Sequence, residues 1–180
     1  MNPNPALFKV KEFEETFKLE HTSKAVCDAY FEKAKDVALT KGHVEPVLMM
    51  FAPERRFLLP IAGLVESPEQ HSEIEKLVKS YVREHRVFAL CAVSLAIVTV
   101  VQDKDRNRAE AVIVWAQFTG EKPHGRFATA GRDAASRKIH RLTETEIPAD
   151  GQFSSLFKTL PVNGEYDVDT LYRGDGKWEG

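Results

Sequence analysis

Two pairs of polar residues come closest to what a catalytic site would need, and the first is an H-x-E pair formed by His43 and Glu45. In the zinc deaminase signature this spacing supplies a metal ligand and a proton shuttle, but a later P-C-x-x-C segment must complete the site. This chain has no such segment: its only cysteines are Cys27, which precedes His43, and Cys91, which has no second cysteine nearby. We therefore predict no metal and no cofactor, and interpret His43 as a turn histidine before a strand.

The second pair, Arg108 and Glu110, stands two positions apart at the start of a predicted strand, so both side chains share one face. If Glu110 were half buried on that apolar face, it would need a cation, and Arg108 is within reach. A solvated strand entrance is the other interpretation. With His43 and Glu45, these are the candidate catalytic residues of a small enzyme that has a pocket between helices and sheet.

Residues 122–141 hold the one local excess of positive charge. The candidate anion-binding residues are Arg126, Arg132, Arg137, Lys138, His140 and Arg141. Three interpretations are open: protection of an edge strand from aggregation, a surface for nucleic acid or an anionic ligand, and a match to the acidic C-terminal residues. A net charge of -2 gives no reason to expect nucleic acid or a membrane as partner, so edge protection is preferred.

The architecture depends on residues 88–101, fourteen positions (FALCAVSLAIVTVV) without a charge. About 20 apolar residues are needed to cross a bilayer, and the valines, isoleucine and threonine favour a strand over a helix. Residues 109–118 alternate and form its antiparallel partner after the loop 102–108. Trp115 and Phe118 on this hairpin are candidate interface residues.

Local signals place the other elements. A helix fits residues 23–41, with Thr22 or Ser23 as its cap and Gly42 after its last turn. A second helix begins after Ser67 with proline at its first position. Strands are expected at 44–52, 56–62, 126–131 and 137–142, and the first sixteen or so residues are expected to form an irregular arm.

This order, α-β-β-α-β-β with a further β-β pair, predicts an α+β fold: a two-layer antiparallel sheet with both helices on one face. Residues 1–150 are expected to form a single domain. Residues 151–180 are rich in glycine and acidic side chains and are expected to form an extended, partly docked tail. Polar residues do not alternate along 88–101, so both faces of that strand should be covered. Helices would cover one face. The other face would be covered by the tail, a further layer or a second subunit.

The layout of residues 23–118 resembles a family of uncharacterised bacterial and phage-borne proteins. The matching residues of the G-[HV]-x-x-P, V-S and R-x-E-A motifs are Gly42, His43, Pro46, Val93, Ser94, Arg108, Glu110 and Ala111. Where that family continues V-S-E-A-W, this chain has V-S-L-A-I. The resemblance implies a bacterial or mobile-element origin and no specific activity.

The chain lacks G-x-S-x-G, H-E-x-x-H and a glycine-rich phosphate loop, so binding is favoured over catalysis. We predict a small interaction domain that acts as a homo-oligomer or with a macromolecular partner. The residues MNPNPALFKVKEF show no secretory pattern, so the cytoplasm is the expected location.

Overall fold

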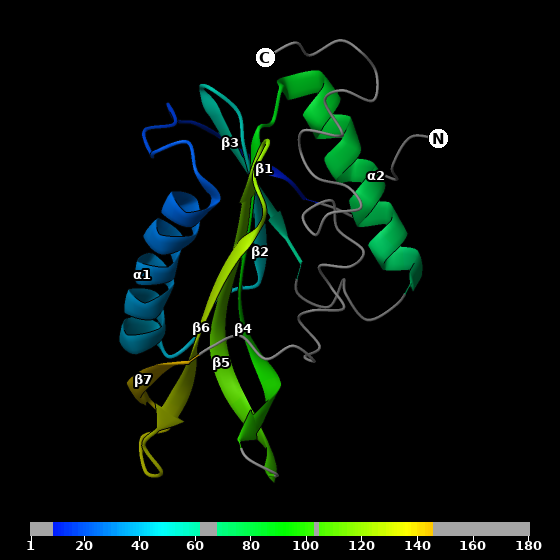
Figure 1. Ribbon diagram of the computed structural model, residues 1–180. Coiled ribbons are helices and arrows are strands. Elements are labelled where there is room, and N and C mark those ends of the chain that lie inside the picture. Colours follow the sequence, from blue (N-terminus) through cyan, green and yellow to red (C-terminus); the bar gives the residue numbers. More distant parts are fainter. Residues whose placement is uncertain (1–8, 62–67, 103–104, 146–180) are drawn as a thin grey trace.

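The computed structural model describes residues 9–61, 68–102 and 105–145. Its centre is a seven-stranded antiparallel sheet in the order β1-β3-β2-β4-β5-β6-β7, flanked by two helices (Figure 1). The elements are, in chain order, β1 (Lys11–Glu14), α1 (Ser23–Lys41), β2 (Val47–Phe51), β3 (Arg55–Pro60), α2 (Pro68–His85), β4 (Ala89–Gln102), β5 (Asp105–Phe118), β6 (His124–Arg132) and β7 (Ile139–Thr145). The predicted tail at 151–180 lies outside the described residues. Within the described ranges, no helix is long and apolar enough to span a membrane.

Both helices begin where the sequence predicts, and α1 also ends there. The hydroxyl oxygen of Thr22 accepts a hydrogen bond from the N–H of Ala25 at 3.0 Å, which satisfies one free donor of the first turn. Gly42 has a left-handed φ of 72°, and its N–H donates to the carbonyl of Ala38. α2 starts at Pro68, the predicted first helical position.

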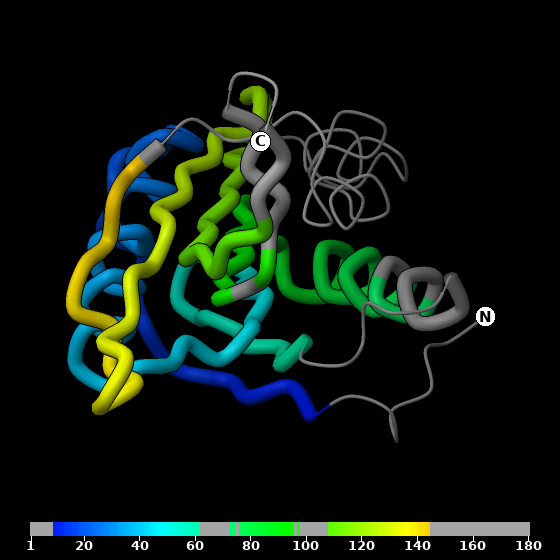
Figure 2. The backbone as a smooth tube through the Cα atoms, turned by 90° about the horizontal axis from the view of Figure 1, so that it is seen from below, coloured from blue at the N-terminus to red at the C-terminus, as the bar shows by residue number. Residues whose placement is uncertain are grey.

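The α+β class, the antiparallel sheet and the order of elements from α1 to β7 are confirmed, but the helices lie on opposite faces of the sheet. Successive strand residues point to opposite faces. In β3, Arg56 lines a pocket with Tyr30 of α1, whereas the Phe57 ring packs against Tyr81 and His85 of α2 at 4.8 and 4.7 Å. The structure thus corrects the prediction of two layers with both helices on one face. Three layers are seen, helix, sheet and helix (Figures 1 and 2).

β4 consists of two halves with different neighbours. Its inner half, residues 89–93, pairs with β2 on one side and β5 on the other, and all its side chains are buried. Its outer half, residues 94–102, pairs with β5 alone among the described strands. The outer part of the β4–β5 hairpin therefore extends beyond β2 and β3 (Figure 1). On the other side of the hairpin, β5 pairs with β6 through residues 111–116.

The predicted strand boundaries fail at the two ends of the sheet. β1 lies within the expected irregular arm and pairs with β3, but its four side chains are all exposed. It therefore has no buried alternating face that a sequence pattern could reveal. At the other end, β7 begins at Ile139 and not at 137, because Arg137 takes a left-handed φ of 62° in the preceding turn.

Candidate functional site

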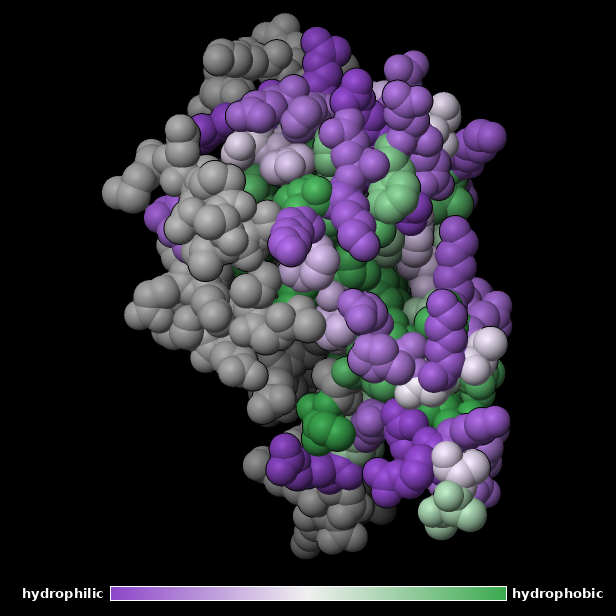
Figure 3. Space-filling model, turned by 180° about the vertical axis from the view of Figure 1, so that it is seen from behind, coloured by the Kyte–Doolittle hydropathy of each residue, from purple (hydrophilic) through white to green (hydrophobic). Residues whose placement is uncertain are grey.

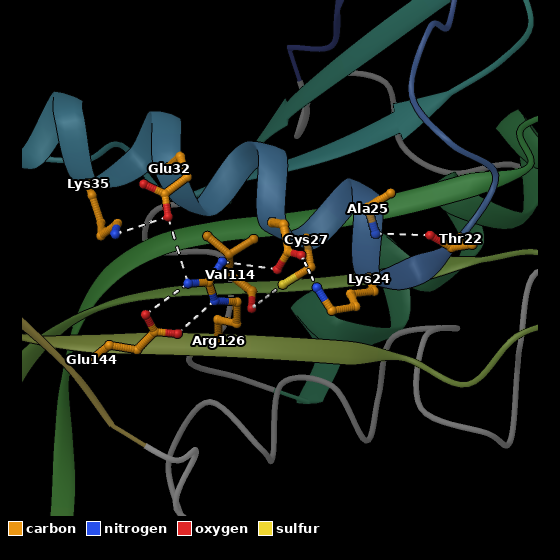
Figure 4. Close-up of polar contacts among 10 residues, drawn as sticks. Thr22, Lys24, Ala25, Cys27, Glu32, Lys35, Val114, Arg126 and Glu144 are labelled. Atoms are coloured by element: carbon orange, nitrogen blue, oxygen red, sulfur yellow. Dashed lines mark hydrogen bonds and ion pairs between the residues drawn. The ribbon is translucent and has the colours of Figure 1, made fainter.

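Arg126, predicted to belong to an anion-binding surface, is occupied by carboxylates of its own chain. Its guanidinium donates to both oxygens of Glu144 at 2.7 and 2.8 Å and to Asp28 at 3.0 Å, and lies 3.7 Å from Glu32 (Figure 4). It also stacks over the Phe31 ring at 4.3 Å. The hydrogen bonds with Glu144 raise the pKa of Arg126 and lower the pKa of Glu144. This cluster fastens β6 and β7 to α1.

Glu110 has a cation partner, but it is not the predicted one. Arg132 of β6 donates to the Glu110 carboxylate at 2.7 Å and to the carbonyl oxygens of Gly42 and Arg137 at 3.0 and 2.7 Å. Arg108 is exposed and lies opposite residue 99 of β4. Glu110 and Arg132 therefore form a clamp between β5, β6 and the end of α1, and the predicted catalytic pairing of Arg108 with Glu110 is not formed.

The four remaining residues of the predicted anion-binding set are exposed. They are Arg137, Lys138, His140 and Arg141, in the β6–β7 turn and on β7. β7 is the last of the described strands in the sheet order. This is the position that the edge-protection interpretation requires.

The two predicted interface residues face opposite sides of β5. Phe118 is buried in an aromatic cluster, where its ring lies 5.0 Å from His21, 5.3 Å from Phe88 and 6.0 Å from Phe17. Trp115 lies on the other face and is half buried. Phe118 therefore belongs to the core of its own chain and offers little surface to a partner.

A pocket of about 560 Å³ lies between α1 and the strands β2 and β3. α1 packs mainly on β4 to β7 and contacts β2 and β3 less closely in the described part of the chain. The predicted candidates His43 and Glu45 both line the pocket and both are exposed, whereas Arg108 and Glu110 do not line it. The apolar part of its lining consists of Ala34, Val37, Val44, Val47, Met49, Leu58 and Val93.

An adjoining pocket of about 480 Å³ shares Tyr30, Lys33 and Arg56 with the first and continues toward Phe17 and Phe51. Together the two pockets are called the α1 groove below. Burial raises the pKa of the Tyr30 phenol, although the neighbouring Arg56 partly opposes this, so the hydroxyl keeps its proton at neutral pH. Seen from behind, hydrophobic surface is visible between hydrophilic side chains (Figure 3).

Tyr30, Lys33 and Arg56 line the groove but were not predicted as site residues. Two-residue alternation along β3 would place Arg56 on the same face as Leu58, which is a usable signal. Tyr30 lies on the buried side of α1, where its position in the sequence suggests a core residue. Val37, on the same helix, is 37% exposed because it faces the groove.

The outer half of β4 is the second candidate site, because it presents an open strand edge. No described strand pairs with it on the β2 side. Its sequence, SLAIVTVVQ, contains no charge, and Ile97 is 42% exposed. Unpaired backbone groups beside apolar side chains favour the addition of another strand.

Three comparisons, with protein-family models, with curated proteins and with solved structures, gave no match. The resemblance noted for residues 23–118 therefore remains a prediction. Among the described residues, no three His, Cys, Asp or Glu side chains gather as a metal ion would require.

Proposed function

We propose that this protein is an interaction domain that self-associates through the outer half of β4. The observation that carries the proposal is a nine-residue strand edge, residues 94–102, that has no charge in its sequence and no partner on one side among the described strands. An edge of this kind is a template for another chain, and natural proteins normally protect it with charge, proline, a bulge or a cover.

The two terminal strands of the sheet have such protection. β1 has only four residues, KEFE, of which three are charged. β7 carries exposed His140, Arg141 and Glu144, and the β6–β7 pairing is interrupted by a bulge at Gly131 and Arg132. The outer half of β4 has no comparable charge, so we infer that a partner covers it.

A second copy of the chain is the partner that fits this edge. Two outer halves that pair antiparallel about a two-fold axis would bring the same uncharged segment against itself, with no like charges opposed. Such pairing would join two seven-stranded sheets into one continuous sheet. It would also remove the exposed Ile97 side chains from water.

Sedimentation velocity over a range of concentrations tests this assembly. We expect the wild-type chain to dimerise and Ile97→Lys to weaken dimerisation at least about tenfold, because a charge is costly at a dry strand interface. Leu39→Lys is the control, since Leu39 is 45% exposed and lies on α1. A wild-type chain that stays monomeric at every concentration would remove the proposal.

A small enzyme is the second candidate function, because His43 and Glu45 line the same pocket. A histidine that faces bound substrate supplies a general base near neutral pH. Chromogenic esters, phosphates and glycosides test this alternative. Turnover that disappears in His43→Ala but persists in His140→Ala would favour it, and no turnover of any substrate would count against it.

A further inference from the structure

The first pocket of the α1 groove combines an apolar floor with a rim on which cations outnumber carboxylates. Val47, Met49 and Leu58 of β2 and β3 form the floor, and Val93 of β4 continues it. Val37 of α1 stands at its side and is 37% exposed, so apolar surface remains open to water there. A volume of about 560 Å³ is within the usual range for small-molecule sites, roughly 300–1,000 Å³.

Positive charge predominates around this floor. The first pocket is lined by Lys33, Lys41 and Arg56 but by one carboxylate, that of Glu45. The adjoining pocket adds Lys18 and two carboxylates, Glu14 and Glu15. The Glu15 carboxylate lies 2.8 Å from Nε of Arg56 and neutralises part of its charge. Lys33 and Lys41 are therefore the cations that the first pocket offers to a ligand.

Neither of these lysines is engaged by an acid among the described residues. The Lys33 ammonium lies over the Tyr30 ring, 4.8 Å from its centre. Lys41 stands in the last turn of α1 and has no carboxylate within ion-pair distance in the described part of the chain. Both are exposed, so an incoming anion would not have to displace a protein carboxylate.

The hydroxyl of Tyr30 adds a neutral hydrogen-bond donor between the two pockets, since Tyr30 lines both. A carboxylate at this position would meet a hydroxyl donor and the Lys33 ammonium together. Charge-assisted hydrogen bonds of this type are roughly twice as strong as neutral ones. The apolar floor extends from there past Leu58 to Val93.

We infer that the α1 groove binds an amphipathic anion, a carboxylate that carries an unbranched or aromatic apolar group. The anionic head lies near Tyr30 and Lys33, and the apolar group covers the floor formed by Met49, Leu58 and Val93. This site is separate from the proposed pairing of β4 edges and does not depend on it.

Isothermal titration with decanoate tests the site directly. Saturable binding is expected, whereas decyltrimethylammonium, which has a chain of equal length and the opposite charge, should bind at least about tenfold more weakly. Equal binding of the two compounds, or no saturable heat with decanoate, would overturn the inference.

Matched variants assign the binding to this groove. Val37→Asp places a carboxylate on its side and should weaken decanoate binding at least about tenfold, whereas Leu39→Asp, on the same helix but outside the pocket, should leave binding within about twofold. Both positions are exposed, which keeps the cost to folding small. Equal losses in the two variants would contradict the assignment.

A charge test separates attraction to this rim from attraction to the whole chain. The double variant Lys33→Glu/Lys41→Glu should abolish decanoate binding, whereas Lys122→Glu/Lys138→Glu changes net charge equally at exposed sites outside the pocket and should preserve it. Ile97→Lys should also bind decanoate normally, so failure of the dimer would not be mistaken for failure of this site. Loss of binding in the Lys122/Lys138 variant would overturn the inference.

Discussion

The inner and outer halves of β4 have similar uncharged sequences but different surroundings. Residues 89–93 have a strand on each side and a helix over each face, and Leu90 and Cys91 are fully buried. Ile97 in the outer half is 42% exposed, and that half has one described strand neighbour. An uncharged sequence therefore does not indicate by itself whether a strand lies inside its own sheet or extends beyond its neighbours.

The largest difference between the halves should be in thiol reactivity. Burial raises the pKa of Cys27 to about 12 and that of Cys91 well above its usual value, so neither forms a thiolate readily at pH 8. With a disulfide reagent we expect Cys91 to react at least about 1,000-fold more slowly than a cysteine placed by Ile97→Cys, because Cys91 must wait for unfolding.

Protein concentration sharpens this measurement. If two outer halves pair, labelling of the Ile97→Cys variant should slow as its concentration rises, while the rate at Cys91 stays low throughout. Fast labelling of Cys91 in the folded protein would show that the inner half is open too, and the comparison would fail.

Side-chain truncation should give the next largest difference. Leu90→Ala removes fully buried atoms from the inner half and should lower the free energy of unfolding by about 2–5 kcal/mol. Ile97→Ala should cost less than about 1 kcal/mol when urea unfolding is followed at low protein concentration. Equal costs would mean that Ile97 is as well packed as Leu90.

The clamp formed by Arg132 lies beside the outer half, since its partner Glu110 pairs with Ile97. Arg132→Ala removes charge-assisted hydrogen bonds to Glu110 and two carbonyls, and should cost about 1–3 kcal/mol. Lys138→Ala, an exposed control on the following turn, should cost less than about 0.5 kcal/mol. If Arg132→Ala left the free energy of unfolding unchanged, the clamp would not stabilise the hairpin.

The smallest effect should be a loss of folding stability in acid, and it should come from the side of the inner half. Arg126 pairs with Val114 of β5, which in turn pairs with Val93 of the inner half. Partial burial opposes ionisation of Asp28, but hydrogen bonds and charge from Lys24 and Arg126 outweigh it and lower its pKa; the pKa of Glu144 is lowered by Arg126. Stability from these carboxylates is therefore present above their usual values of 3.8 and 4.5 and is lost as pH falls through the lowered values.

Because these side chains are partly exposed, each pair should contribute about 0.2–1 kcal/mol. Urea unfolding at pH 7 and pH 3 should show that Arg126→Gln removes part of the pH dependence, whereas Arg141→Gln does not. An unchanged pH dependence in Arg126→Gln would mean that the cluster adds nothing to acid sensitivity.

Elements governed by local rules were predictable from the sequence. Thr22 and Gly42 bound the first helix, Pro68 begins the second, and the turn at Pro53 closes the β2–β3 hairpin through the hydrogen bond from Ala52 N–H to the Arg55 carbonyl. Each signal depends on conformational preferences within a few residues, so it stands in the linear sequence.

The sites were less predictable, because their residues come from distant segments. His43 and Glu45 were proposed for a pocket and do line one, but Tyr30 and Arg56 meet there only when α1 lies beside β3. Arg132 replaces Arg108 as the partner of Glu110 because β6 lies next to β5. A charged side chain selects its partner by distance in space, and distance along the chain does not determine it.

Periodicity, capping residues and missing charge act locally, so the sequence was enough to predict the α+β class and the order of the elements from α1 to β7. The tertiary structure alone decided that α1 and α2 lie on opposite faces, that β1 joins the sheet and that residues 94–102 extend beyond β2. Those outcomes depend on which surfaces meet when layers pack, and the pairing of layers is a property of the whole chain.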